Sequence, residues 1–138
     1  MAQKLAGKPF TVVGNGEQTR DFTFISDIVD AILLSARSDK TEVVFNVGSG
    51  ATVSVNHLVE LLGGDKIHIP KRPGEPDCTF ADITRVRSEL GWEPKITIEE
   101  GVKKILEKID YWRDTPVWTP DRIAHATKDW FDYLGRNP

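Results

Sequence analysis

The stretch VVFNVGSGATVSVNHLVELLGG, residues 43–64, joins an apolar run, a glycine-rich turn and an amphipathic segment. The apolar run at residues 43–47 predicts a strand buried on both faces, as in a parallel sheet. Gly48 and Gly50 suit a turn, and Ser54 suits the N-cap of a helix that ends at the Gly63-Gly64 pair. The apolar stripe of this helix consists of Val55, Leu58, Val59 and Leu62. A strand, a turn and a helix in this order indicate an α/β fold.

The same alternation continues on both sides of this stretch. Further strands are predicted at residues 10–13, 22–25 and 66–69. Further helices are predicted after Ser26 or Asp27 (with Ile28, Ile32, Leu33 and Ala36 on one face), after Asp82, from the capping box at Thr97, and from Thr119-Pro120 to residue 134. We therefore expect an α/β fold with short strands interleaved with helices and a helical C-terminal third, as a single domain over residues 1–138.

Composition excludes several classes of partner and site. The 138 residues carry 18 Lys and Arg against 21 Asp and Glu, a net charge of −3, whereas nucleic-acid-binding domains are usually basic. No apolar run approaches the ~20 residues that a transmembrane helix needs, and the first residues lack the apolar core of an export signal. The only cysteine, Cys78, cannot form an internal disulfide, and the three histidines are scattered. We expect a cytoplasmic protein without a nucleic-acid partner, a membrane partner or a metal.

Two glycine-rich loops invite a phosphate-binding interpretation, but neither fits a dinucleotide fingerprint. The fingerprint needs a glycine or alanine five positions after its first glycine, and Thr19 and Val53 stand there after Gly14 and Gly48. We interpret both loops as turns between elements. Neither tyrosine of the chain is followed by a lysine four residues later, so a Tyr-x-x-x-Lys catalytic centre is absent from this sequence.

Basic residues beside two of the turns suggest an anion site. Arg20 follows the first glycine-rich loop, and Lys71 and Arg72 open the proline-rich loop at residues 70–77. Arginine binds phosphate oxygens through two parallel hydrogen bonds, so Arg20 and Arg72 are candidates for a diphosphate clamp. Residue types alone leave solvated surface charge as the alternative. Trp112, Trp118 and Trp130 surround Pro116, and we expect them to pack the last two helices together.

Four ordered blocks carry a family resemblance: GKPFTVVGNGEQTRDFTFISDIVDAI, VFNVGSGATVSV, PKRPGEPDCTFADITRVRSELGWEP and TIEEGVKKIL. They resemble the C-terminal, substrate-binding portion of the NAD-dependent nucleotide-sugar epimerases and dehydratases. This family belongs to the extended short-chain dehydrogenases/reductases, and UDP-glucose 4-epimerase is its best-known member. The resemblance covers residues 1 to about 110. It implies a partial extended short-chain dehydrogenase fold that lacks the N-terminal Rossmann core.

The resemblance also implies roles for individual residues. Arg20 and Arg72 are similar to two arginines that contact the diphosphate of the substrate, and Glu75 to an acid that binds the ribose. The strand formed by Phe10, Thr11, Val12 and Val13 resembles one whose backbone lies against the base. Gln18 is expected to hydrogen-bond the nucleotide. The implied ligand is a nucleotide-sugar such as a UDP-sugar.

What the sequence lacks limits the activity that the resemblance implies. The family's NAD loop and catalytic tyrosine and lysine have no counterpart in it, so we expect no catalysis by this chain alone and no cofactor bound to it. In the family, parts of this region pack on the Rossmann sheet, so we expect exposed apolar surface around residues 43–47 and 28–36. Such a surface predicts a homo-oligomer or a companion NAD-binding chain. The alternative function is a non-catalytic relic or repurposed domain that only self-associates.

Overall fold

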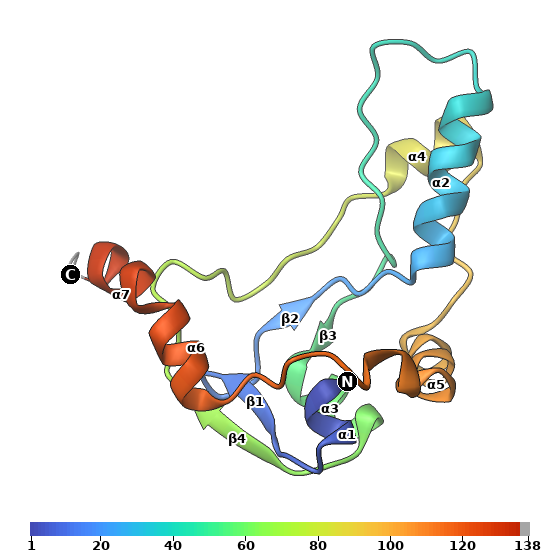
Figure 1. Ribbon diagram of the computed structural model, residues 1–138. Helices are drawn as coiled ribbons and strands as arrows, with labels where there is room; N and C mark the ends of the chain where they lie inside the picture. The colour runs from blue at the N-terminus through green and yellow to red at the C-terminus, as the bar shows by residue number, and fades with distance from the viewer. Residues whose placement is uncertain (136–138) are drawn as a thin grey trace.

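Two short sheets lie at the centre of the fold, and each joins strands that are distant in sequence (Figure 1). The computed structural model describes residues 1–135. Strand β1 (Phe10–Val13) pairs in parallel with β4 (Lys66–Ile69). Strand β2 (Thr19–Arg20) pairs antiparallel with β3 (Val53–Ser54). The mixed α/β class and the strands expected at residues 10–13 and 66–69 are confirmed.

Local capping signals set the helix boundaries. The helices are α1 (Ala2–Leu5), α2 (Ile25–Arg37), α3 (Val55–Leu62), α4 (Thr84–Leu90), α5 (Ile98–Glu107), the 3₁₀ helix η1 (Ile109–Trp112), α6 (Pro120–Ala126) and α7 (Lys128–Leu134). The hydroxyls of Ser54, Thr97 and Thr119 each accept a hydrogen bond from a backbone N–H in the first turn of the helix they precede. Thr97 and Glu100 complete the expected capping box.

We call β1, β4, α3 and α5 the body of the molecule. The side chains of its buried core come from all but β4: Phe10, Val12, Val59, Leu62 and Val102. Met1 and partly buried residues of α3 and α5 pack around this cluster. Helix α3 therefore covers one face of β1, and α5 packs against α3 (Figure 1).

We call α2, α4 and the extended residues 43–47 the arm, which projects away from the body (Figure 1). Its core is a second cluster made of Ala31, Ile83, Val86 and Trp92. The Trp92 indole N–H donates to the carbonyl of Asp27, whose buried carboxylate accepts the backbone N–H groups of residues 95 and 96. The arm is thus held by a small apolar cluster and a buried acid.

Two predicted strands are wrong. Residues 22–24 and 43–47 form no strand, and Ile25 is the first residue of α2. β-Propensity describes side chains that suit a half-buried surface, and an extended segment can provide this without a partner strand. In the second segment Phe45 and Val47 pack on the arm cluster, whereas Val44 is 78% exposed. The segment is therefore covered on one face and not on both.

Helix α2 has the expected position, but the stripe predicted from its sequence is largely exposed. Ile32 is 61% and Leu33 is 44% exposed, and Ile25 and Val29 on the same face are also open. Ala31 is the apolar residue of α2 that is buried in the arm cluster. Exposed apolar surface was expected here and at residues 43–47, and both segments carry it.

The predicted helix from residue 120 to 134 is interrupted at Thr127, which separates α6 from α7. The Thr127 hydroxyl donates to the carbonyl of Ile123, a side-chain bond that competes with the helical pattern. Trp130 was expected to help pack the predicted helix that begins at Thr97 against the one over residues 120–134. Its indole N–H instead donates to the carbonyl of Pro73, in the loop after β4. Among residues 1–135, no helix combines the length and apolar character needed to cross a membrane.

Candidate functional site

The loop after β4 contains a tight turn that brings Arg72 and Glu75 together. Pro73 and Gly74 occupy its two central positions, and the Glu75 N–H donates to the Arg72 carbonyl at 3.3 Å. Gly74 has a φ of +72°, a conformation that the third position of a type II turn requires and that glycine adopts without strain. The turn places the side chains of Arg72 and Glu75 within reach of one another.

The far end of the same loop runs beside β2, which carries Arg20. The Thr19 N–H donates to the Asp77 carbonyl at 2.9 Å, and the Thr79 N–H donates back to Thr19 at 3.2 Å. Thr19 thus forms a bridge to Cys78 on one side and pairs with β3 on the other. These contacts set the register between β2 and the loop, so Arg20 reaches Glu75.

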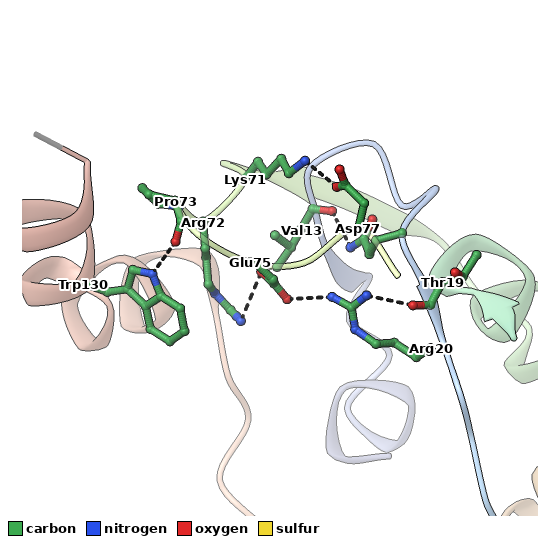
Figure 2. Close-up of polar contacts among 10 residues, drawn as sticks. Val13, Thr19, Arg20, Lys71, Arg72, Pro73, Glu75, Asp77 and Trp130 are labelled. Atoms are coloured by element: carbon green, nitrogen blue, oxygen red, sulfur yellow. Dashed lines mark hydrogen bonds and ion pairs between the residues drawn. The ribbon is translucent and has the colours of Figure 1, made fainter. Parts of the chain in front are cut away.

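Arg20 and Arg72 meet at a single carboxylate (Figure 2). An Arg20 guanidinium nitrogen donates to Glu75 Oε1 at 3.3 Å, and an Arg72 guanidinium nitrogen lies 3.7 Å from Glu75 Oε2. A second nitrogen of Arg20 donates to the Thr19 carbonyl at 2.8 Å, which fixes the plane of its guanidinium. Two candidate residues expected to act together are therefore adjacent, with the third between them.

The electrostatics of this cluster are unbalanced. Two guanidinium groups share one carboxylate, so the trio carries one net positive charge, and its side chains are only 20–29% exposed. Glu75 Oε2 is buried and, within the described residues, accepts no hydrogen bond. The neighbouring Lys71–Asp77 ion pair is exposed and neutral overall. The Lys71 ammonium holds the pKa of the Asp77 carboxyl below its usual value.

The remaining candidate residues lie on or beside β1. Phe10 and Val12 are buried in the body core, whereas Thr11 and Val13 are half-buried. The Gln18 amide nitrogen donates to the Val13 carbonyl at 2.9 Å, so Gln18 is attached to the end of β1. Within residues 1–135, no strand pairs with the edge of β1 opposite β4.

Two cavities adjoin the arginine cluster. A cavity of about 20 Å³, lined in part by Val13, Gln18 and Glu75, has room for about one water molecule. A groove of about 490 Å³, between the end of β4 and α6–α7, includes Arg72 in its lining. Volumes of 300–1,000 Å³ are typical of small-molecule sites, so only the groove has the size for a ligand larger than water.

Sequence reasoning missed the contact that holds α7 against the arginine loop. Trp130 donates to the Pro73 carbonyl at 2.8 Å (Figure 2). The Leu134 side chain lies close to Gly74. Because 57 residues separate Trp130 from Pro73, no local sequence pattern indicates the contact. The C-terminal helices therefore help to position the turn between Arg72 and Glu75.

The glycine-rich loops do not fit an NAD pyrophosphate. The Asp21 carboxylate accepts a hydrogen bond from the backbone N–H of Ser49 at 2.6 Å. The loop at residues 48–50 therefore already binds a negatively charged group of the protein, where a pyrophosphate would need the same donor. A side chain at Gly16 would collide with Asn56, so the other loop is closed by α3. Within residues 1–135, neither loop joins a strand to a helix as the dinucleotide-binding fold requires.

Comparison with known proteins agrees with the architecture. The sequence model of the family described as GDP-mannose 4,6 dehydratase matches residues 1–105, which is most of the chain. The chain belongs to the NAD-dependent nucleotide-sugar epimerases and dehydratases. It is 34% identical over 110 residues to a UDP-glucose 4-epimerase of Mycolicibacterium smegmatis, an alignment that covers 75% of this chain and 35% of that protein.

Solved structures of this family share the fold. A UDP-glucose 4-epimerase of Thermotoga maritima, crystallised with UDP-glucose, superposes with a TM-score of 0.73 at 34% identity, covering 80% of this chain and 37% of that one. A UDP-glucuronic acid 4-epimerase of Bacillus cereus, in complex with UDP-glucuronic acid and NAD, superposes with a TM-score of 0.74 at 29% identity, covering 80% and 38%. The chain spans about a third of the length of the curated relatives it matches.

Proposed function

We propose that this chain forms the nucleotide-sugar-binding portion of an NAD-dependent epimerase or dehydratase. The observation that carries the proposal is the approach of Arg20 and Arg72, which are 52 residues apart in sequence, to one carboxylate. A pyrophosphate group offers oxygens to two guanidinium groups, and arginine suits such planar paired recognition. Two related structures contain UDP-sugars, which supports a nucleoside diphosphate as the ligand class.

The proposed roles follow the family resemblance residue by residue. Arg20 and Arg72 bind the diphosphate, and Glu75 accepts hydrogen bonds from the ribose hydroxyls. The backbone of β1, from Phe10 to Val13, lies beside the base, and Gln18 hydrogen-bonds the nucleotide. Among residues 1–135 no strand pairs with the edge of β1 opposite β4, which supports this placement because backbone groups other than the Val13 carbonyl, which Gln18 contacts, can meet a ligand there.

The proposed role is binding rather than catalysis by these residues alone. NAD chemistry in the family needs a dinucleotide loop and a Tyr-x-x-x-Lys centre, and the sequence contains neither. We infer that a companion NAD-binding chain or segment supplies the redox chemistry to a sugar held here. A cytoplasmic location is part of the same proposal, supported by the single cysteine.

Calorimetric titration with UDP tests the arginine clamp. Arg20→Ala and Arg72→Ala should each weaken UDP binding by about 10- to 150-fold, because a hydrogen bond to a charged group contributes ~1.5–3 kcal/mol. Arg87→Ala is the matched control, since Arg87 pairs with Glu93 in the arm, away from the loop. If the wild-type chain does not bind UDP, or if both variants bind it as the control does, the proposal is wrong.

A second candidate function is a non-catalytic domain that only self-associates. The apolar face of α2, with Ile25, Val29, Ile32 and Leu33 open to solvent, favours it. Contiguous exposed apolar surface usually marks an interaction site, and a second copy of the chain presents the same face. This alternative expects an oligomer without nucleotide affinity, whereas the first expects nucleotide affinity in either assembly state.

A further inference from the structure

The position between Arg20 and Arg72 is already filled by an anion, the carboxylate of Glu75. Its two oxygens face one guanidinium each, at 3.3 Å from Arg20 and 3.7 Å from Arg72 (Figure 2). A diphosphate that engaged both arginines would take up the same two positive charges that now face Glu75. The carboxylate and the incoming anion therefore compete for one pair of cations.

Glu75 is held by one long hydrogen bond, from Arg20 to Oε1 at 3.3 Å, and by the positive charge of Arg72. Within the described residues its buried Oε2 accepts no hydrogen bond, and 3.7 Å to Arg72 is an ion-pair distance. A buried carboxylate oxygen without a donor is an unfavourable arrangement. A stronger anion can thus replace Glu75 at the arginines without breaking well-formed hydrogen bonds to Oε2.

The small cavity beside Glu75 supports the same conclusion. Its volume of about 20 Å³ leaves room for about one water molecule beside Glu75, so a larger ligand cannot enter there while the Glu75 side chain keeps this position. The neighbouring Lys71–Asp77 pair already balances its own charges, so it does not neutralise a displaced Glu75. The displaced carboxylate needs hydrogen-bond donors, and a ligand with hydroxyl groups supplies them in addition to water.

We propose that Glu75 is an internal competitor that makes the arginine pair selective for nucleoside diphosphates over simple anions. This inference rests on the proposed function, which supplies the ribose hydroxyls as donors for the displaced carboxylate. Inorganic pyrophosphate must displace Glu75 and offers it nothing in return. A nucleoside diphosphate displaces it and provides a vicinal diol.

Glu75→Gln tests the competition, with inorganic pyrophosphate and UDP as the two titrants. The neutral amide no longer competes for the arginines, so pyrophosphate affinity should rise about tenfold, a size expected for two partly exposed ion pairs. UDP should gain less or lose affinity, because the diol loses its charged acceptor. The ratio of UDP affinity to pyrophosphate affinity should therefore fall.

Glu89→Gln is the matched control, because it removes one negative charge from an ion-paired glutamate on α4 in the arm. It should leave both affinities unchanged, which excludes a general charge effect. Glu75→Asp provides a second test if Glu75→Gln fails to fold by circular dichroism. The shorter carboxylate cannot reach both arginines, so pyrophosphate affinity should again rise.

The outcomes separate this inference from the proposed function. If UDP binding depends on both arginines but pyrophosphate affinity does not rise in Glu75→Gln, the competition is wrong and the proposed function stands. If pyrophosphate binds more tightly to the variant while UDP binds neither protein, Glu75 competes for the arginines without conferring selectivity for nucleoside diphosphates, and both the inference and the proposed function fail. A parallel loss of both affinities would assign Glu75 a merely structural role and would overturn the inference.

Discussion

The body covers its own apolar surface, whereas the arm does not. In the body, α3 and α5 pack on Phe10 and Val12 of β1, and the cluster has partly buried neighbours on both helices and at Met1. In the arm, one side of α2 packs on α4 and Trp92, while Ile32 and Leu33 on the other side face solvent. Both regions have cores of similar size, so the difference lies in what covers their outer faces.

This contrast indicates different structural roles within one chain. The arginine cluster is attached to the body through β4 and β2. The candidate site therefore lies on the region whose apolar core is covered by its own helices. The arm joins the body near Asp21, whose carboxylate accepts the N–H groups of Ser49 and Ala81. We infer that the arm is the part that depends on another protein surface.

The largest expected effect is that of Trp92→Ala. Trp92 is 2% exposed and holds the arm cluster together, and truncation of a buried tryptophan typically costs about 3–5 kcal/mol. Native-state hydrogen exchange should show faster exchange in α2 and α4, with the β1–β4 amides still protected. Trp118→Ala, at a tryptophan that is 54% exposed, is the matched control and should change little.

A different outcome of that exchange experiment would break the contrast. If the amides of β1 and β4 lose protection together with those of α2, the body and the arm unfold as one cooperative unit. The single domain expected from the sequence would then be the better description. If only the amides of the arm exchange faster, the arginine site belongs to a region that stays folded when the arm opens.

A smaller effect on folding, but a clear one on assembly, is expected for Leu33→Glu. The residue lies on the open face of α2, so we expect stability to change by only ~0.5 kcal/mol. A charge on this face should weaken self-association about tenfold or more, since apolar residues at the centre of an interface dominate its affinity. Sedimentation over a range of concentrations measures the change.

Leu134→Glu is the matched control for this variant, because Leu134 is 49% exposed on α7 and lies outside the arm. It should leave association unchanged. A wild-type chain that stays monomeric at high concentration would contradict the homo-oligomer, and a companion NAD-binding chain would remain the proposed partner. If Leu33→Glu and Leu134→Glu weaken self-association equally, the exposed face of α2 is not the specific interface.

Local sequence signals correctly predicted helix ends, which depend on only a few consecutive residues. The capping box at Thr97, the Ser54 cap and the glycine after α4 all act within one helical turn, so their outcome does not depend on the rest of the fold. The strand expected at residues 43–47 failed for the opposite reason. A strand requires a partner, and none of the described residues provides one for this segment.

The candidate site was predictable in composition but not in arrangement. The resemblance selected Arg20, Arg72 and Glu75, and the structure brings all three together. Their bridging geometry depends on the turn at Pro73-Gly74 and on the pairing of Thr19 with the loop, two features that no spacing reveals. The Trp130 contact is a similar case, because it joins distant segments through one side chain.

The smallest expected effects test whether the two regions differ in surface charge as well as in coverage. Asp77 in the site loop is exposed and Glu89 in the arm is half-buried, and both carboxyls have a lowered pKa, caused mainly by hydrogen bonds from Lys71 and Arg85 respectively. A carboxyl whose pKa is lower in the folded than in the unfolded protein stabilises the fold at any pH above its unfolded-state pKa, and this contribution disappears as the pH falls through its folded-state pKa.

Asp77→Asn and Glu89→Gln should therefore each lower the melting temperature slightly at pH 7. The difference from wild type should vanish only once the pH has fallen below the lowered pKa of each folded-state carboxyl, where that carboxyl is protonated. Thermal melts of both variants and the wild type between about pH 2 and about pH 7, the range in which carboxyl groups titrate, measure this difference. High salt should reduce the effects of both substitutions. Matching profiles would confine the contrast between body and arm to apolar coverage, whereas a large effect of one variant alone would show that its ion pair supports the region around it.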